Sequence, residues 1–99
     1  MFVHTVYFWV NPGVGQEAVA AMARDCRELL GKMPMVKHLW AGVPAGTQRP
    51  VVDNSYALGL TVILDDSTGH DAYQAHPQHK EFIARHKQHW SRIQVYDFV

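Results

Sequence analysis

One short segment of the sequence gathers side chains that are suited to acid–base chemistry. Tyr73, His76 and His79 lie within seven residues of one another, and Pro77 directly follows the first histidine. Histidine exchanges a proton near neutral pH, and a tyrosine hydroxyl holds an oxygen by hydrogen bonding. Together they suit removal of a proton from an activated carbon beside a stabilised oxyanion. The alternative is that these groups only satisfy one another in a tightly packed helix junction.

Pro77 predicts how these side chains are placed. The residue before a proline is disfavoured in the α region, so His76 should end one helix. Proline is well tolerated at the first helical position, so Pro77 should begin a second helix and His79 should lie on its first turn. We expect this break to direct the polar groups into a pocket, which His4 on the first strand also faces.

The remaining pattern predicts alternating strands and helices. Predicted strands cover Phe2–Val10, Val36–Val43, Ser55–Leu64 and Arg92–Val99, and predicted helices cover Gln16–Met33, Asp65–His76 and Pro77–Trp90. Cys26 falls on the apolar stripe of the first helix and is interpreted as a packed thiol. The order β-α-β-β-α-β predicts a ferredoxin-like α+β protomer, with a four-stranded antiparallel sheet and helices on one face. We expect residues 1–99 to form a single domain.

The first and third predicted strands also indicate a partner. Both are largely apolar on their two faces and carry no charged residue. The helices cover one face of such a sheet, and the chain has no further element to cover the other. We therefore expect a homodimer in which two sheets pack face to face across a two-fold axis.

Composition narrows the class of protein. Nine basic residues balance nine acidic ones, which gives no argument for binding to nucleic acid or to a membrane surface. The sequence contains neither a recognisable signal peptide nor an apolar run of the roughly 20 residues that span a membrane. A single cysteine fits a reducing compartment. We expect a cytoplasmic protein.

Metal and cofactor sites are alternatives that the residues support less well. His86 with His89, and His76 with His79, each offer a helical pair of ligands, but no thiolate or carboxylate is placed to join them. The tryptophans suit core and interface positions as well as a haem or oxygen pocket, and no flavin, haem or phosphate-binding motif is present. We therefore expect neither a metal nor a cofactor.

Several motifs together resemble the stress-responsive dimeric α/β-barrel (Dabb) domain family, over essentially the whole chain. They are His4-x-Val6-x-Phe8, Asn54-x-Tyr56, Tyr73-x-x-His76-Pro77-x-His79 with Phe82, and Val95-x-Asp97-Phe98. The resemblance implies a ferredoxin-like protomer and a dimer whose two sheets close into a barrel. It implies no single activity, because the family includes plant stress proteins and the polyketide-cyclising olivetolic acid cyclase. The wider fold group includes cofactor-free monooxygenases of the antibiotic-biosynthesis type.

The resemblance to the cyclase implies roles for individual residues. His79 matches its general base, and Tyr73 matches the tyrosine that holds and orients that base. His4, His76 and Trp90 match residues of the substrate region. One position departs from the cyclase, which has a further histidine where this chain has Leu58, so we expect a less polar pocket.

These observations lead to two hypotheses of different kinds. The first is binding, or cofactor-free acid–base processing, of a small hydrophobic carbonyl or phenolic metabolite, as in a cyclase, a lyase or a monooxygenase-like member of the fold group. The second is a stress-associated structural or assembly protein without enzymatic activity. The sequence itself does not specify a substrate.

Overall fold

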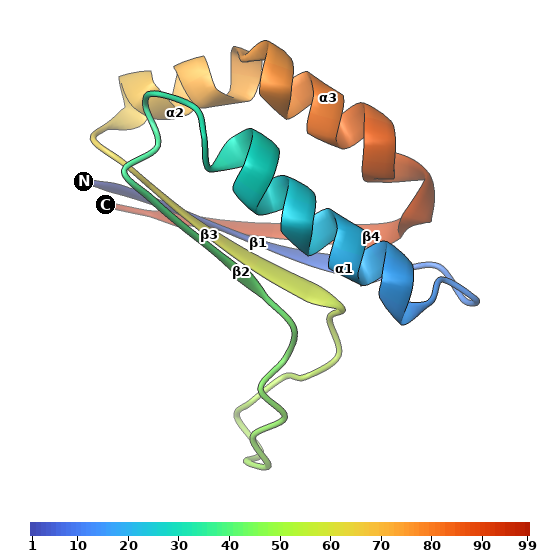
Figure 1. Ribbon diagram of the computed structural model, residues 1–99. Helices are drawn as coiled ribbons and strands as arrows, with labels where there is room; N and C mark the ends of the chain where they lie inside the picture. Colours follow the sequence, from blue (N-terminus) through green and yellow to red (C-terminus); the bar gives the residue numbers. More distant parts are fainter.

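Four strands form one antiparallel sheet in the order β2-β3-β1-β4 in the computed structural model, which describes residues 1–99 (Figure 1). The strands are β1 (Phe2–Val10), β2 (His38–Gly42), β3 (Leu58–Leu64) and β4 (Trp90–Phe98). Each neighbouring pair runs antiparallel. The structure confirms the ferredoxin-like α+β fold that the order of elements predicts.

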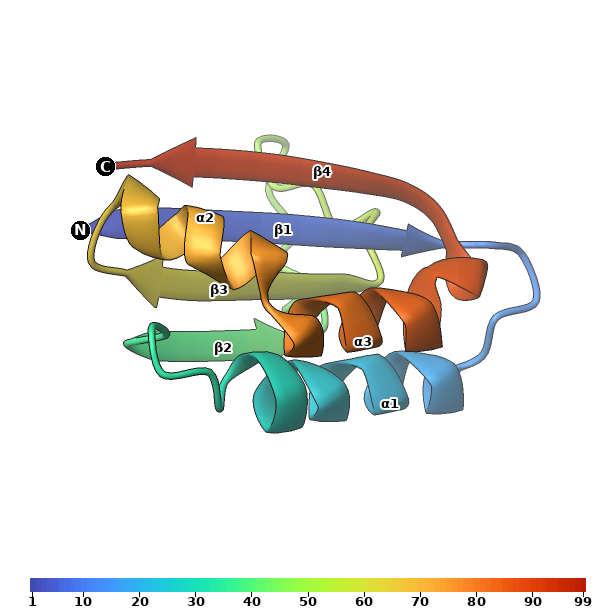
Figure 2. The same ribbon diagram turned by 90° about the horizontal axis from the view of Figure 1, so that it is seen from above.

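The helices lie together over one face of this sheet (Figure 1). They are α1 (Gln16–Asp25), α2 (Ser67–Ala75) and α3 (Pro77–His86), with a π-helical turn η1 (Cys26–Leu30) and a 3₁₀ turn η2 (Lys87–His89). Seen from above, α1, α2 and α3 leave the length of β4 without a helix over it (Figure 2). None of the helices combines the length and the apolar character needed to cross a bilayer.

The break between α2 and α3 is confirmed. His76 has an extended backbone, with φ −67° and ψ 142°, and Pro77 is the first residue of α3. The side chain of His76 caps α3, because its Nδ1 accepts a hydrogen bond of 3.1 Å from the backbone N–H of Gln78. At the start of α2, the carboxylate of Asp66 accepts a hydrogen bond of 2.8 Å from the N–H of Gly69.

Several element ends differ from the sequence prediction. The first helix changes to π-helical geometry at Cys26 and ends at Leu30 rather than at Met33. There the N–H of Gly31 donates to the carbonyl of Cys26, five residues back, at 2.8 Å. The last helix ends at His86, so Trp90 is the first residue of β4 and does not belong to a helix.

The predicted second and third strands are both shorter than expected. Residues 43–57 instead form a long arm between β2 and β3, on the side of the sheet away from the helices (Figure 1). Ser55, which was predicted to open the third strand, lies on this arm, and its hydroxyl accepts a hydrogen bond of 3.0 Å from the indole N–H of Trp9. Side-chain contacts of this kind attach the arm to the sheet at residues that form no β-sheet hydrogen bonds.

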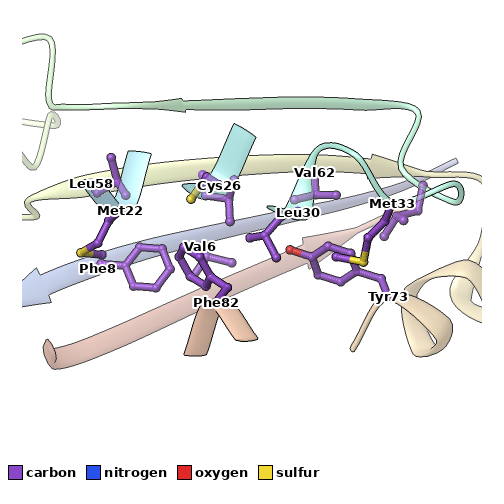
Figure 3. Close-up of a cluster of buried hydrophobic side chains, with 12 residues drawn as sticks. Val6, Phe8, Met22, Cys26, Leu30, Met33, Leu58, Val62, Tyr73 and Phe82 are labelled. Atoms are coloured by element: carbon purple, nitrogen blue, oxygen red, sulfur yellow. The ribbon is translucent and has the colours of Figure 1, made fainter. Parts of the chain in front are cut away.

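The hydrophobic core lies between the helices and the sheet (Figure 3). Every second residue of β3, from Leu58 to Leu64, is buried against it, as alternation in a half-covered sheet requires. The helices contribute Met22 and Cys26 from the first helical segment and Phe82 from α3. Burial raises the pKa of the Cys26 thiol to about 12, so this cysteine is a packed, unreactive side chain.

The opposite face of the sheet has no helix over it and carries several large apolar side chains that are exposed (Figure 1). Trp40, Tyr96 and Phe98 have exposed fractions of 60%, 59% and 58%. The strand register places them on the same face as Val3 and Thr5. Val3 pairs with Phe98 and Thr5 with Tyr96, and Thr5 also pairs with Thr61, which is opposite Trp40. Large exposed apolar surfaces of this kind usually mark an interaction site.

Candidate functional site

A cavity of about 190 Å³ lies between the sheet and the helices α2 and α3. Four of the five predicted site residues line it: His4 from β1, Tyr73 from α2, His79 from α3 and Trp90 from the start of β4. Of the thirteen lining residues, ten are hydrophobic, and none is a lysine, an arginine or an acidic residue. The sequence therefore predicted a group of residues that the fold does bring together.

Tyr73 and His79 meet across the helix break. Their rings are in edge contact, with centroids 4.9 Å apart. No hydrogen bond joins the two side chains, and the buried Nδ1 of His79 has no hydrogen-bond partner in the protein. The contact between Tyr73 and His79 is therefore aromatic in this structure, and the orienting role of Tyr73 stays a prediction.

The environment of this pair sets its protonation. Burial lowers the pKa of His79 from its ordinary value of 6.5, and the charges that His4 and His70 can carry lower it further. Burial raises the pKa of the Tyr73 hydroxyl well above its usual range. At neutral pH the cavity therefore contains a neutral imidazole, which can accept a proton, and a neutral hydroxyl, which can donate a hydrogen bond.

His4 is held by a residue that the sequence analysis did not assign to the site. Its Nδ1 lies 2.6 Å from Oδ1 of Asp97, the residue opposite it on β4. Burial lowers the pKa of His4 more than the hydrogen bond to Asp97 raises it. His4 is therefore neutral at neutral pH, its Nδ1–H donates to the carboxylate, and its Nε2 has no hydrogen-bond partner in the protein.

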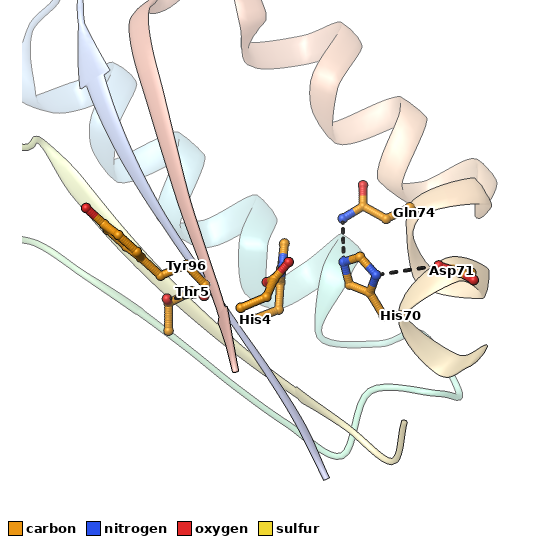
Figure 4. Close-up of polar contacts among 7 residues, drawn as sticks. His4, Thr5, His70, Asp71, Gln74 and Tyr96 are labelled. Carbon is orange, nitrogen blue, oxygen red and sulfur yellow. Dashed lines mark hydrogen bonds and ion pairs between the residues drawn. The ribbon is translucent and has the colours of Figure 1, made fainter. Parts of the chain in front are cut away.

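His70 is a second neighbour that the sequence analysis missed. Its ring stacks on Phe2 at 4.5 Å between centroids and lies 5.0 Å from the ring of His4. Figure 4 shows its two nitrogens directed towards Gln74, at 3.3 Å, and Asp71, at 3.7 Å. His70 precedes Tyr73 by three residues, and that spacing on one helix face was a signal that could have identified it.

One group of residues has the composition of a metal site. Ligand atoms of His4, His70 and Asp97 lie within 4.8 Å of one another, which makes these three the residues that could hold a metal ion. The pairs considered from the sequence do not form such a group. His86 is instead bonded through Nε2 to the carboxylate of Asp25 at 2.7 Å.

The two remaining predicted residues differ in position. His76 is not part of the cavity lining, and its ring caps α3, so its role in substrate binding stays a prediction. Trp90 does line the cavity, and its indole packs against Phe8 and Phe82 at 5.0 and 6.0 Å between centroids. The indole Nε1 of Trp90 is buried and has no hydrogen-bond partner.

Comparison with known proteins agrees with this fold. A model of the stress responsive A/B barrel (Dabb) domain family matches residues 2–99. The chain therefore belongs to this family, as its motifs predicted. A search of curated proteins gave no match.

Three solved structures illustrate the likeness in fold. A dimeric ferredoxin-like protein of unknown function from Thermobifida fusca has a TM-score of 0.84 at 22% identity, over 99% of this chain and 89% of that one. A Dabb family protein from Mesorhizobium loti has a TM-score of 0.79 at 21% identity, over 99% and 94%. A hydroxynitrile lyase from Passiflora edulis has a TM-score of 0.82 at 14% identity, over 98% and 90%. At these identities the likeness concerns the fold and assigns no reaction.

Proposed function

We propose that this protein is a homodimer whose cavity binds a small hydrophobic carbonyl or phenolic metabolite and processes it by acid–base chemistry without a cofactor. The observation that supports this most directly is that His4, Tyr73 and His79 line one cavity whose other walls are almost entirely apolar. Two imidazoles and a hydroxyl among hydrophobic side chains suit a ligand that is mostly apolar and carries an oxygen.

The proposed chemistry follows from the protonation of the cavity. His79 is neutral and removes a proton from a carbon next to a carbonyl, and the electron pair moves to the carbonyl oxygen. The hydroxyl of Tyr73, which keeps its own proton, donates a hydrogen bond to the resulting enolate oxygen. The unpaired Nε2 of His4, held in place by Asp97, provides a further contact for the substrate.

The arrangement supports two reactions. In the first, the enolate carbon attacks a second carbonyl of the same molecule and closes a ring, and the imidazolium of His79 returns its proton to the new alkoxide. In the second, which involves no prior enolate, the imidazole takes the proton of a hydroxyl group, the alkoxide becomes a carbonyl as the adjacent carbon–carbon bond breaks, and the departing carbanion takes the electron pair of that bond and the proton of the imidazolium, which is a lyase reaction. The Passiflora edulis relative is named as a lyase, and this supports keeping both outcomes within the proposal.

The dimer is the second part of the proposal. The apolar face that carries Trp40, Tyr96 and Phe98 has no cover within one chain, and the arm of residues 43–57 projects on that same side (Figure 1). Relatives with the same fold are dimeric, including the one from Thermobifida fusca. Face-to-face packing of two such sheets about a two-fold axis would bury both apolar faces.

A thermal-shift screen tests the binding site. Wild type, His79→Gln and a control, His89→Gln, are compared against β-keto, phenolic and quinone compounds. His89 lies on the 3₁₀ turn η2 outside the cavity lining. A compound that binds only the native state raises Tm, and we expect that rise in wild type and the control but not in His79→Gln. A cleanly folded dimer that responds to no compound would instead favour a structural, stress-associated role.

A further inference from the structure

Three side chains from separate elements place metal-ligating atoms close together. His4 comes from β1, His70 from α2 and Asp97 from β4, and one ligand atom of each lies within 4.8 Å of the others. Two imidazole nitrogens and a carboxylate oxygen form a ligand set that suits divalent transition ions such as Zn²⁺ and Fe²⁺. The residue types and their spacing therefore satisfy the first requirement of a metal site.

Two of the three ligands are already next to each other. His4 is 4% exposed, and its Nδ1 lies 2.6 Å from Oδ1 of Asp97, because the two residues are opposite each other on β1 and β4. The ion pairs of the lysines and arginines involve other acidic residues, so no fixed positive charge occupies the carboxylate of Asp97. The side chain of Asp97 is 35% exposed, which gives an ion a path from solvent.

His70 can complete the site by a small movement of its ring. Two ligands that each lie about 2.0–2.2 Å from a zinc ion are at most about 4.4 Å apart, so the group has to close by a few tenths of an ångström or more. The ring of His70 is partly buried and stacks on Phe2, and its nitrogens face Gln74 at 3.3 Å and Asp71 at 3.7 Å (Figure 4). Whichever nitrogen binds the ion, the other keeps a polar neighbour, as histidine ligands of metals usually do.

We propose that His4, His70 and Asp97 form a binding site for a divalent transition metal ion such as Zn²⁺. Three protein ligands leave at least one coordination position for water or for an oxygen atom of another molecule. His4 also lines the cavity, so the metal site adjoins it. The inference does not rest on the proposed function, because the acid–base step uses Tyr73 and His79, and neither is a ligand here.

Isothermal titration calorimetry with Zn²⁺ on the chelator-treated protein tests the site. We expect wild type to bind one ion per chain. His70→Gln and Asp97→Asn each remove one ligand and should raise Kd by about tenfold or more, since even the loss of a residue that only supports a ligand has an effect of this size. The matched control is His89→Gln, which removes a histidine at the other end of β1, where the carbonyl of residue 89 bonds to Asn11. The control should bind like wild type.

A gain of signal tests the same site without depending on a loss of binding. Asp97→Cys replaces the carboxylate with a thiol of similar reach. A thiolate bound to Co²⁺ gives a charge-transfer absorption in the near ultraviolet. Wild type should not give this band, because its single cysteine, Cys26, is buried in the core. We expect the band when Co²⁺ is added to reduced Asp97→Cys, and its loss when His70→Gln is combined with that change.

Three results would overturn the site: no binding of Zn²⁺ by wild type, binding that is unchanged in both His70→Gln and Asp97→Asn, or a folded Asp97→Cys that gives no charge-transfer band with Co²⁺. Circular dichroism of each variant shows whether it is folded. These measurements use no ligand of the cavity, so a negative result would leave the proposed function to its own thermal-shift test.

Discussion

His4 and Asp97 are joined by a hydrogen bond of 2.6 Å although 93 residues separate them in the sequence. The pair forms because β1 and β4 are neighbours in register, with His4 directly opposite Asp97. The carboxylate fixes which nitrogen of His4 carries the proton, and it leaves the other nitrogen for the cavity. His4 therefore has an orienting partner, which His79 lacks.

Replacing Asp97 with Asn should disturb this orientation. An amide side chain can donate as well as accept, so it does not enforce one tautomer of His4. We expect wild type to show His4 protonated at Nδ1 in long-range ¹H–¹⁵N spectra, and Asp97→Asn to show a mixture of tautomers. Asp71→Asn, next to His70, is the matched control and should leave the His4 signals in place. A wild-type His4 protonated at Nε2 would contradict this assignment.

Replacing Tyr73 with Phe should weaken ligand binding while leaving the stability of the fold nearly unchanged. The side chain is 1% exposed, and no hydrogen bond of its hydroxyl is present. Removing that hydroxyl leaves no buried partner unpaired, so the free energy of unfolding in urea should change by less than about 1 kcal/mol. Tyr73→Ala should cost about 3–5 kcal/mol, because it leaves a large void in the core. Binding of carbonyl ligands should weaken in Tyr73→Phe, and unchanged binding would remove Tyr73 from the proposed mechanism.

The stability of the protein should depend on pH through its buried histidines. The folded state lowers the pKa of His79 and His4 below 6.5, so the unfolded chain binds more protons in the window just below that value. The free energy of unfolding should therefore fall as the pH drops below 6.5 and level off below the folded-state pKa values. His79→Gln should show a shallower fall than wild type or His89→Gln. An identical pH dependence in all three proteins would contradict the lowered pKa of His79.

Introducing a charge on the uncovered face of the sheet should dissociate the dimer. Trp40→Glu places a carboxylate in the apolar surface that includes Tyr96 and Phe98, which would bury it without a partner. Sedimentation equilibrium at micromolar concentration should give the mass of two chains for wild type and of one chain for Trp40→Glu. The control is Lys32→Glu, at an exposed residue just after η1, and this variant should remain dimeric. A monomeric wild type would contradict the dimer directly.

The sequence predicted the parts of the site that depend on local rules. Pro77 excluded helix at His76 and started the next helix, so the approach of Tyr73 and His79 across the break followed from backbone sterics. The alternation of β1 placed His4 on a single face, which the structure confirms as the helix-covered one. These predictions depend only on residues that are close in the chain, or on the two-residue alternation within a single strand.

The parts that were missed depend on tertiary contacts. The pairing of His4 with Asp97 requires the register of two strands at opposite ends of the chain, which no local pattern contains. Trp90 was predicted on a helix because it follows His86 at helical spacing, but the helix ends at His86 and the chain turns into β4. The arm of residues 43–57 was partly predicted as strand, because Ser55 and Tyr56 continue the apolar alternation of β3.

Exchange of the α-protons of acetophenone in D₂O tests the central claim most directly. Removal of such a proton by His79 and return of a deuteron from solvent requires no metal, cofactor or second substrate, and NMR follows the loss of the methyl signal. We predict faster exchange with wild type and with His89→Gln than in buffer, and exchange at the buffer rate with His79→Gln. Exchange with His79→Gln that matches wild type, or no acceleration by wild type while it binds acetophenone, would contradict acid–base catalysis by this cavity.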